Sequence, residues 1–292
     1  MRHIPVLVEE VVESLQLRSG MIIVDCTLGD GGHSERILQK IQPNGVLIGI
    51  DADIVSLDRA KKNLDKYDSK KIFINENFVN LEQILQKNKI NKADGILMDF
   101  GWSSPQFSER GRGFSFNLDE VLDMRYDAKN DGKTAKDIVN NYSEKDLEIL
   151  LRKYGEEKNS KRIALEIVKK RKTKEIVTTN DLVEIVMKIN KKGKAKIHPA
   201  TRVFQAIRME VNNELEVIKK VLPDAVESLS VGGRLAIITF HSLEDSIVKH
   251  YFKSQSDKSI KIINKKPITG SVEELQNNPR SRSAKLRVVE KI

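Results

Sequence analysis

A glycine-rich loop is the first stretch of this sequence whose residue types indicate ligand chemistry. The run DCTLGDGGH, residues 25–33, follows an apolar segment and leads into an amphipathic one. Glycines let the backbone turn sharply and approach a ligand where a Cβ would block it. Asp51 stands 20 residues beyond Gly31, where a carboxylate can accept hydrogen bonds from two ribose hydroxyls. Loop and carboxylate together predict a nucleoside cofactor, and both NAD and S-adenosylmethionine (SAM) carry such a ribose.

Two alternatives stay open at this loop. The NAD fingerprint has a glycine-like residue where this chain has Ser34, so an NAD-dependent oxidoreductase fits imperfectly. No hydride-transfer site is evident either. Asp51, taken alone, could instead cap a helix that starts near Asp53.

A second candidate site follows the apolar run 95–98. The segment DFGWSSPQ, residues 99–106, puts an acid and a Ser-Ser-Pro turn where the reactive end of such a cofactor should lie. Aminomethyltransferases use a short polar turn with proline here, because an exocyclic amine needs acceptors for its N–H bonds while its lone pair faces the methyl group. A conjugated amine such as that of cytosine is a poor nucleophile, so in-line positioning supplies much of the rate, and one proton must leave. Spacing alone also allows an ordinary turn that ends a strand.

The elements that must position these residues alternate along the first hundred residues. Short β-branched runs predict buried parallel strands, and amphipathic stretches between them predict helices. The strands are expected at 21–26, 46–50, 71–74 and 95–98, and the helices at 34–41, 54–64 and 81–88. This order predicts an α/β fold with an open, doubly wound sheet whose ligand crevice lies at the carboxyl ends of the strands.

The pattern changes after Asp99 and later resumes. Residues 134–192 read as helical and charged, 191–196 as a basic loop, and 235–240 and 286–290 as further strands. One long helix is expected from Arg202, with apolar core residues at helical spacing; these are Phe204, Ile207, Val211, Leu215, Ile218 and Leu222. We therefore predict an α/β domain in two parts, 1–104 and 203–292. An inserted, mainly helical and basic substrate-recognition domain, 105–202, separates them.

The positive charge is concentrated in that insertion. Residues 128–202 contain 20 Lys and Arg against 11 Asp and Glu, so this stretch carries the whole formal net charge of +9 and the remainder is neutral. Basic clusters at 169–174 and 191–196 attract a polyanion by releasing its counterions. A solvated helical surface would explain either cluster singly. Segregation into one segment favours a nucleic-acid partner.

Composition excludes several other classes. A lone Cys26 cannot form an internal disulfide, and the five histidines lack paired metal-ligand spacing, so no metal is expected. No apolar run approaches the roughly 18 residues of a membrane span. The acidic residues near the start argue against a signal peptide. We expect a cytoplasmic protein without a membrane partner; the residues leave the oligomeric state open, a homodimer included.

At these residues the chain resembles the bacterial 16S ribosomal RNA cytosine-N4 methyltransferase (RsmH, or MraW) family, nearly from end to end. The matching runs are HIPVLVEEVV, DCTLGDGGHS, DFGWSSPQ, RGRGFSF, LDMRYD, YGEEKNSKRIA, HPATRVFQAIRMEVNNEL, GGRLAIITFHSLED and NPRSRSAKLRV. Several are long and compositionally unusual, which makes the set specific.

The resemblance implies a class I SAM-dependent methyltransferase fold with a helical insertion, acting on N4 of a cytidine in the decoding centre of the small ribosomal subunit. The family's cofactor site, carried over by motif, comprises Gly31, Gly32, His33, Asp51, Phe78, Asp99 and Gln106. Of these, Asp51 suits the ribose and Phe78 an adenine face, whereas Asp99 or Gln106 would hold the adenine edge or the methionine amino group. His33 has an alternative role as a helix residue that packs beside the loop.

The leading hypothesis is thus a methyltransferase in which Ser104 and the adjacent proline orient the amine. The alternatives are the NAD-dependent oxidoreductase and a non-catalytic RNA-binding or ribosome-assembly protein with a nucleotide fold. Candidates for RNA contact are Arg112, Asp123, Arg125, Arg202 and Arg208. Each could equally form a surface or interdomain ion pair.

Overall fold

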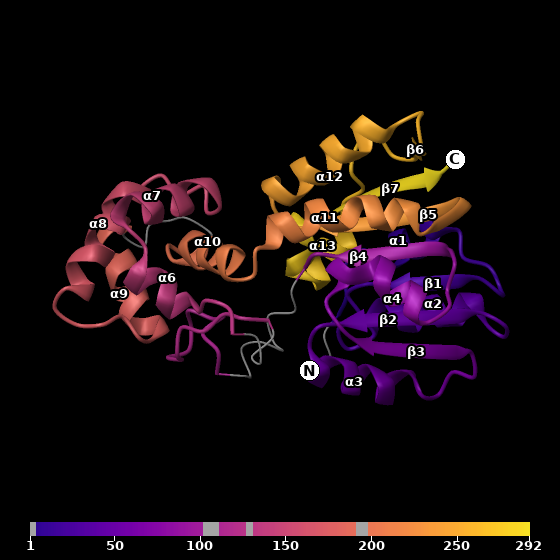
Figure 1. The fold of residues 1–292 in the computed structure, drawn as a ribbon, viewed down its shortest axis with the longest axis horizontal. Coiled ribbons are helices and arrows are strands. Elements are labelled where there is room, and N and C mark those ends of the chain that lie inside the picture. The colour runs from indigo at the N-terminus through magenta and orange to yellow at the C-terminus, as the bar shows by residue number, and fades with distance from the viewer. Residues whose placement is uncertain (1–3, 102–110, 127–130, 191–197) are drawn as a thin grey trace. The chain divides into compact units, whose positions relative to one another are not determined.

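The computed structural model describes residues 4–101, 111–126, 131–190 and 198–292. The chain forms two compact units (Figure 1). The first comprises Met1–Trp102 and Leu215–Ile292, and the second comprises Ser103–Glu214. Ser104 and Gln106, and the basic loop expected at 191–196, lie outside the described residues.

The described part of the first unit is built on a seven-stranded sheet of order β3-β2-β1-β4-β5-β7-β6. The strands are β1 Ile22–Asp25, β2 Val46–Asp51, β3 Lys70–Asn75, β4 Ala93–Asp99, β5 Leu229–Thr239, β6 Ile260–Ile262 and β7 Lys285–Lys291. The pairs from β3 to β5 are parallel, whereas β7 runs antiparallel to both β5 and β6. This confirms the predicted α/β class and its parallel sheet.

Successive residues of a strand point to opposite faces of the sheet, so a strand of consecutive apolar residues makes both faces apolar. Helices cover both of these faces. Ile23, for example, packs with α1 (Val8–Leu15), α2 (Gly32–Ile41) and α3 (Ile54–Leu64), while Val24 packs on the other face. That second face carries α4 (Leu81–Lys87), α11 (Glu214–Glu227) and α12 (Ser242–Gln255). The remaining elements of this unit are the 3₁₀ turns η1 (Phe78–Asn80) and η2 (Pro279–Ser283), and α13 (Val272–Asn277).

The described part of the second unit is helical. Its helices are α6 Ala135–Asn141, α7 Glu144–Lys153, α8 Ser160–Arg171, α9 Thr179–Ile189 and α10 Thr201–Val211. Thr134 and Thr178 form capping boxes with Asp137 and Asp181, which satisfy backbone N–H groups at the starts of α6 and α9. Each helix buries an apolar face, as Leu147, Ile163, Leu182 and Ile207 illustrate; the unit therefore has a core of its own.

One expected element is wrong and several were missed, among them the helices α1, α12 and α13. The single helix predicted from Arg202 through Leu222 is two helices, because Asn213 adopts a left-handed backbone with φ 50° and ends the run after α10. Asparagine tolerates this conformation better than most residues. The predicted apolar stripe is nevertheless core, since Phe204, Ile207 and Leu222 are buried. The short strand β6 was not predicted. No helix in the described parts of the chain is long and apolar enough to span a membrane.

Candidate cofactor site

Three aspartates end three neighbouring strands of the sheet. Asp25 closes β1, Asp51 closes β2 and Asp99 closes β4, and these strands are adjacent in the order β2-β1-β4. Parallel strands present their carboxyl ends at one edge, which is where open α/β sheets bind ligands. The sheet thus gathers the predicted Asp51 and Asp99 at the edge expected for the cofactor.

Asp51 joins two loops. Its Oδ2 accepts a hydrogen bond from the Gly29 amide and its Oδ1 accepts one from the Asp53 amide, both at 2.8 Å. Burial raises the pKa of Asp51 to about 6, although these two amides counteract the effect. The cap of α3 is Asp53, whose carboxylate accepts from the Val55 and Ser56 amides. The structure therefore excludes the alternative that Asp51 caps this helix.

The three glycines of the loop have different surroundings. A Cβ on Gly32 would lie 2.9 Å from Pro5 Cγ, and one on Gly31, whose φ is +82°, would lie 3.0 Å from a Leu64 methyl group. Packing against Pro5 therefore favours glycine at position 32, and the left-handed backbone favours it at position 31. A Cβ on Gly29, where φ is +53°, would meet only a backbone oxygen at 4.0 Å. Gly29 faces open space beside Asp51, and it is not among the cofactor residues predicted from the sequence.

His33 and Asp99 face one another across the start of α2. His33 Nε2 donates to the Val6 carbonyl at 2.8 Å, and its Nδ1 lies 3.9 Å from Asp99 Oδ2. His33 therefore packs beside the loop, as the alternative role would have it, and also lies at the strand edge next to Asp99. Burial raises the pKa of Asp99 to about 6, with His33 acting in the opposite direction.

Two further side chains hold this edge together. Asp25 is 1% exposed and accepts from the Thr27 amide and from the Ser34 hydroxyl, the latter at 2.7 Å. Burial raises the pKa of Asp25. Thr27 Oγ1 in turn accepts from the Asp99 amide at 2.7 Å. Ser34, the mismatch to the NAD fingerprint, is therefore a buried partner of a strand-end carboxylate.

Phe78 follows β3 and opens η1. It is half-buried, and its ring stacks on Phe100 with centroids 6.0 Å apart. Phe100 comes directly after β4, so the pair bridges the ends of β3 and β4, which are not neighbours in the sheet. An aromatic surface near the Asp51 strand end suits a planar base.

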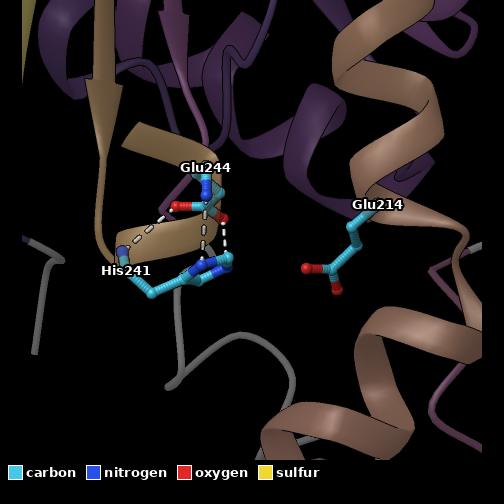
Figure 2. A group of neighbouring side chains, drawn as sticks. All are labelled: Glu214, His241 and Glu244. Carbon is cyan, nitrogen blue, oxygen red and sulfur yellow. Dashed lines mark hydrogen bonds and ion pairs between the residues drawn. The ribbon is translucent and has the colours of Figure 1, made fainter. Parts of the chain in front are cut away.

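The start of α12 brings a buried acid near Asp99. Figure 2 shows Glu244 beside the His241 ring, whose Nδ1 accepts from the Glu244 amide. Glu244 Oε2 also accepts from the Phe240 amide at 2.8 Å. Glu244 is 2% exposed and raises the pKa of Asp99. Glu214, also drawn in Figure 2, pairs with Arg208 in the second unit, with Nε to Oε1 at 2.8 Å.

The candidates for RNA contact in the second unit are largely engaged. Arg125 pairs with Asp123 at 2.8 Å, and Arg112 donates to the carbonyl of Arg125. Arg208 is 5% exposed and forms two hydrogen bonds with Glu214. The guanidinium of Arg208 therefore acts inside the unit and does not face an external ligand.

The residues at the strand edge fit SAM. Asp51 is a half-buried carboxylate whose neighbour Gly29 leaves open space, as a ribose would need. Asp30 Oδ1, in the same loop, is buried and accepts no hydrogen bond from any described residue, so the loop retains an unused acceptor. Acidic side chains at this edge also suit a ligand that carries a sulfonium and an ammonium group.

Sheet order and site together define the class. An antiparallel seventh strand between the fifth and sixth, and an acid at the end of the second strand, characterise class I SAM-dependent methyltransferases. The chain belongs to the MraW methylase family, whose model matches residues 1–292. SAM is the cofactor of this family, and it supplies an electrophilic methyl group.

Close relatives cover the chain throughout. The ribosomal RNA small subunit methyltransferase H of Clostridium botulinum is 47% identical over 308 residues, covering 100% of this chain and 99% of the relative. The protein of the same name from Caldicellulosiruptor saccharolyticus is 46% identical over 306 residues, covering 99% of each.

Solved structures of methyltransferases are also similar at low sequence identity. An rRNA methylase from Streptococcus thermophilus has a TM-score of 0.47 and 11% identity, covering 98% of this chain and 93% of the other. A SAM-dependent O-methyltransferase from Thermotoga maritima has a TM-score of 0.46 and 8% identity, covering 100% of this chain and 68% of the other.

Proposed function

We propose that this methyltransferase transfers the methyl group of SAM to N4 of a cytidine in the decoding centre of 16S ribosomal RNA, in the cytoplasm. The observation that carries the proposal is full-length identity of 46–47% to relatives named as methyltransferases of the small subunit ribosomal RNA. The exocyclic amine as target rests on the Ser-Ser-Pro turn of the sequence, since such turns provide acceptors for amine N–H bonds.

The cofactor would lie along the carboxyl ends of β1, β2 and β4. In this arrangement Asp51 accepts from the ribose hydroxyls and Phe78 covers the adenine, while Gly31, Gly32 and His33 shape the loop. Asp99 or Gln106 would hold the adenine edge or the methionine amino group. The two amides that already bind Asp51 support its role, because they orient the carboxylate before the ligand arrives.

The amine would be held by the segment that follows β4. Ser104 is the residue we assign to orient it, with Pro105 shaping the turn. An in-line arrangement of amine nitrogen, methyl carbon and sulfur leaves little chemistry for the protein beyond alignment and removal of one proton. Ser104→Ala should therefore reduce kcat about tenfold to a hundredfold with little change in SAM affinity.

The inserted segment 105–202 would recognise the RNA. Helix α8 supports this with exposed basic side chains along its length, namely Lys161, Arg162, Lys169 and, at its end, Lys172. Lys169 pairs with Glu166, whereas Arg171 donates to the Val139 carbonyl and so helps hold its own unit together. Exposed lysines and arginines bind phosphates without reading sequence.

The test is methyl transfer from labelled SAM to small ribosomal subunits that lack the modification, followed by nucleoside digestion and mass analysis. Label in N4-methylcytidine, at one site, is the expected result. Label in another nucleoside would overturn the target while keeping the cofactor. SAM binding without label on naked RNA, subunits or earlier assembly particles would favour the non-catalytic alternative. Ser104→Ala and the exposed-surface variant Lys61→Gln are the matched pair for this assay.

A further inference from the structure

The His33 ring lies between a backbone carbonyl and a carboxylate, and this arrangement determines where its hydrogens lie. Nε2 is 2.8 Å from the Val6 carbonyl oxygen, and Nδ1 is 3.9 Å from Asp99 Oδ2. A carbonyl oxygen only accepts hydrogen bonds, so Nε2 must carry a hydrogen in every protonation state of the ring. In the neutral ring Nδ1 is then bare, and its lone pair faces the carboxylate.

The segment that supplies the carbonyl is held from a distant part of the chain. The Leu7 amide donates to Glu274 Oε1 at 2.7 Å, and Asn278 Nδ2 donates to the Ile4 carbonyl at 3.2 Å. Leu7 itself takes a left-handed backbone with φ 54°, which ends the segment and starts α1. The Val6 carbonyl is therefore held in place, and with it the tautomer of His33.

Asp99 is surrounded by groups of both signs. His33 is the basic group that faces it, while Asp25 and Glu244 are the acids that act on it from β1 and α12. The Gly101 amide donates to Oδ1 at 2.8 Å, which leaves Oδ2 directed toward His33. Burial together with the two acids raises the pKa of Asp99 to about 6 despite His33 and Gly101.

Without a proton between them, the bare Nδ1 and the Asp99 carboxylate present lone pairs to each other. One added proton gives either an imidazolium beside a carboxylate or an imidazole beside a carboxylic acid, and each is favourable. The two groups lie within ion-pair distance, so one proton can be shared between them. Asp25 is less suited to this role, because it is 1% exposed whereas the side chain of Asp99 is 13% exposed.

We propose that His33 and Asp99 act together as the acceptor of the proton that leaves the target amine. This inference rests on the proposed transfer to an exocyclic amine. In the reaction a nitrogen–carbon bond forms and the sulfur–methyl bond breaks, so that the sulfonium becomes a neutral thioether. The amine nitrogen loses one proton to the His33–Asp99 pair, which later releases it to water. Gln106 is then left to hold the adenine edge or the amino group.

The first test measures kcat against pH with small subunits and saturating SAM. Native enzyme should lose activity on acidification as the pair gains its proton. In His33→Gln the side-chain amide has the reach of Nε2 and can still donate to the Val6 carbonyl, but Asp99 loses its basic neighbour and keeps its acidic ones, so the acid limb should move up by about one pH unit. Activity should then fall about fivefold near pH 6 and recover in alkali. A fall that is equal at every pH would overturn the inference.

The second test does not depend on turnover. In ¹⁵N spectra of the native protein at neutral pH, His33 Nε2 should carry a hydrogen and Nδ1 should be bare. A bare Nε2 at neutral pH would overturn the inference even if the variant is inactive. His250→Gln is the matched control for both tests, since His250 is exposed on α12 and bonds only to Ser246 among the described contacts.

The two proposals fail separately. Label in another nucleoside with native enzyme refutes the target, whatever the His33 tautomer proves to be. N4-methylcytidine formed by native enzyme, with an acid limb that does not move in His33→Gln, refutes the proton acceptor alone. Asp99→Asn should lower kcat about a hundredfold or more, and titration of this variant with S-adenosylhomocysteine (SAH) separates that loss from any loss of cofactor binding.

Discussion

Cofactor affinity should rise with pH, because Asp51 holds a proton in the free protein at low pH and must release it to solvent when the cofactor binds. Burial raises the pKa of Asp51 to about 6 from its ordinary 3.8. The ionised form of Asp51 is therefore disfavoured in the free folded protein. As pH rises from below 4 through 6, ionisation of this carboxylate lowers the free energy of unfolding by up to about 3 kcal/mol. Ribose hydroxyls that donate to the carboxylate favour the ionised form and bring the pKa down again.

The magnitude follows from the two pKa values. At about pH 5 roughly nine-tenths of Asp51 is protonated in the free protein, and at about pH 7 roughly one-tenth is. If the ligand binds the ionised form, the affinity for SAH rises about tenfold between these pH values, which is about 1.4 kcal/mol. At about pH 6 each binding event should release about half a proton from this group.

Isothermal titration calorimetry with SAH, in buffers of different ionisation enthalpy, measures both the affinity and the released protons. Asp51→Asn should bind SAH more weakly at neutral pH, and its affinity should lack the about tenfold rise with pH. Asp58→Asn is the matched control, because Asp58 is 57% exposed on the same helix that follows Asp51. An affinity that stays flat across this pH range, or a dependence equal in Asp51→Asn and native protein, would refute the reasoning.

Three further predictions concern packing and charge. Asp245→Asn leaves the Arg287 guanidinium, 8% exposed, without its carboxylate partner at 2.6 Å. This should lower the free energy of unfolding, measured by urea denaturation, by about 3 kcal/mol or more. The double variant with Leu at position 245 and Met at position 287 should regain most of that free energy. Gly32→Ala sets a Cβ against Pro5 and should cost about 1 to 3 kcal/mol, with a parallel loss of SAH affinity; a fully stable variant would disprove the contact. Replacing the basic α8 residues by glutamine, at Lys161, Arg162 and Lys172, should weaken RNA binding and flatten its slope against log salt by about 0.7 per lost phosphate contact, and an unchanged slope would move the RNA surface elsewhere.

The sequence predicted the first four strands because each is a short apolar run between helices of clear periodicity. Helix α3 even begins and ends at the predicted residues, since Asp53 caps it. Strand β6 escaped because Ile260–Ile262 is three residues long, and it is defined by pairing with β7 more than by its own composition. The break at Asn213 escaped because the apolar stripe keeps helical spacing on both sides of it. A periodic pattern reports which residues are buried, but it cannot report a single left-handed residue.

The same division holds at the site. Gly31, Gly32 and Asp51 are visible in sequence because a loop and the next strand end have a set spacing. The residues that surround them cannot be predicted in this way. Val6, Glu274 and Asn278 lie far from the loop in the chain and come near it only in the folded protein. The Val6 contribution is a backbone carbonyl, which no residue type encodes. The protonation of His33 thus depends on an atom that every residue possesses, and only the arrangement of chain ends around the sheet selects it. For that reason Asn278→Ala, which removes a donor to this segment, should alter the His33 Nε2 signal in ¹⁵N spectra although Asn278 touches neither His33 nor Asp99; an unaltered signal would mean that the segment is held by other contacts.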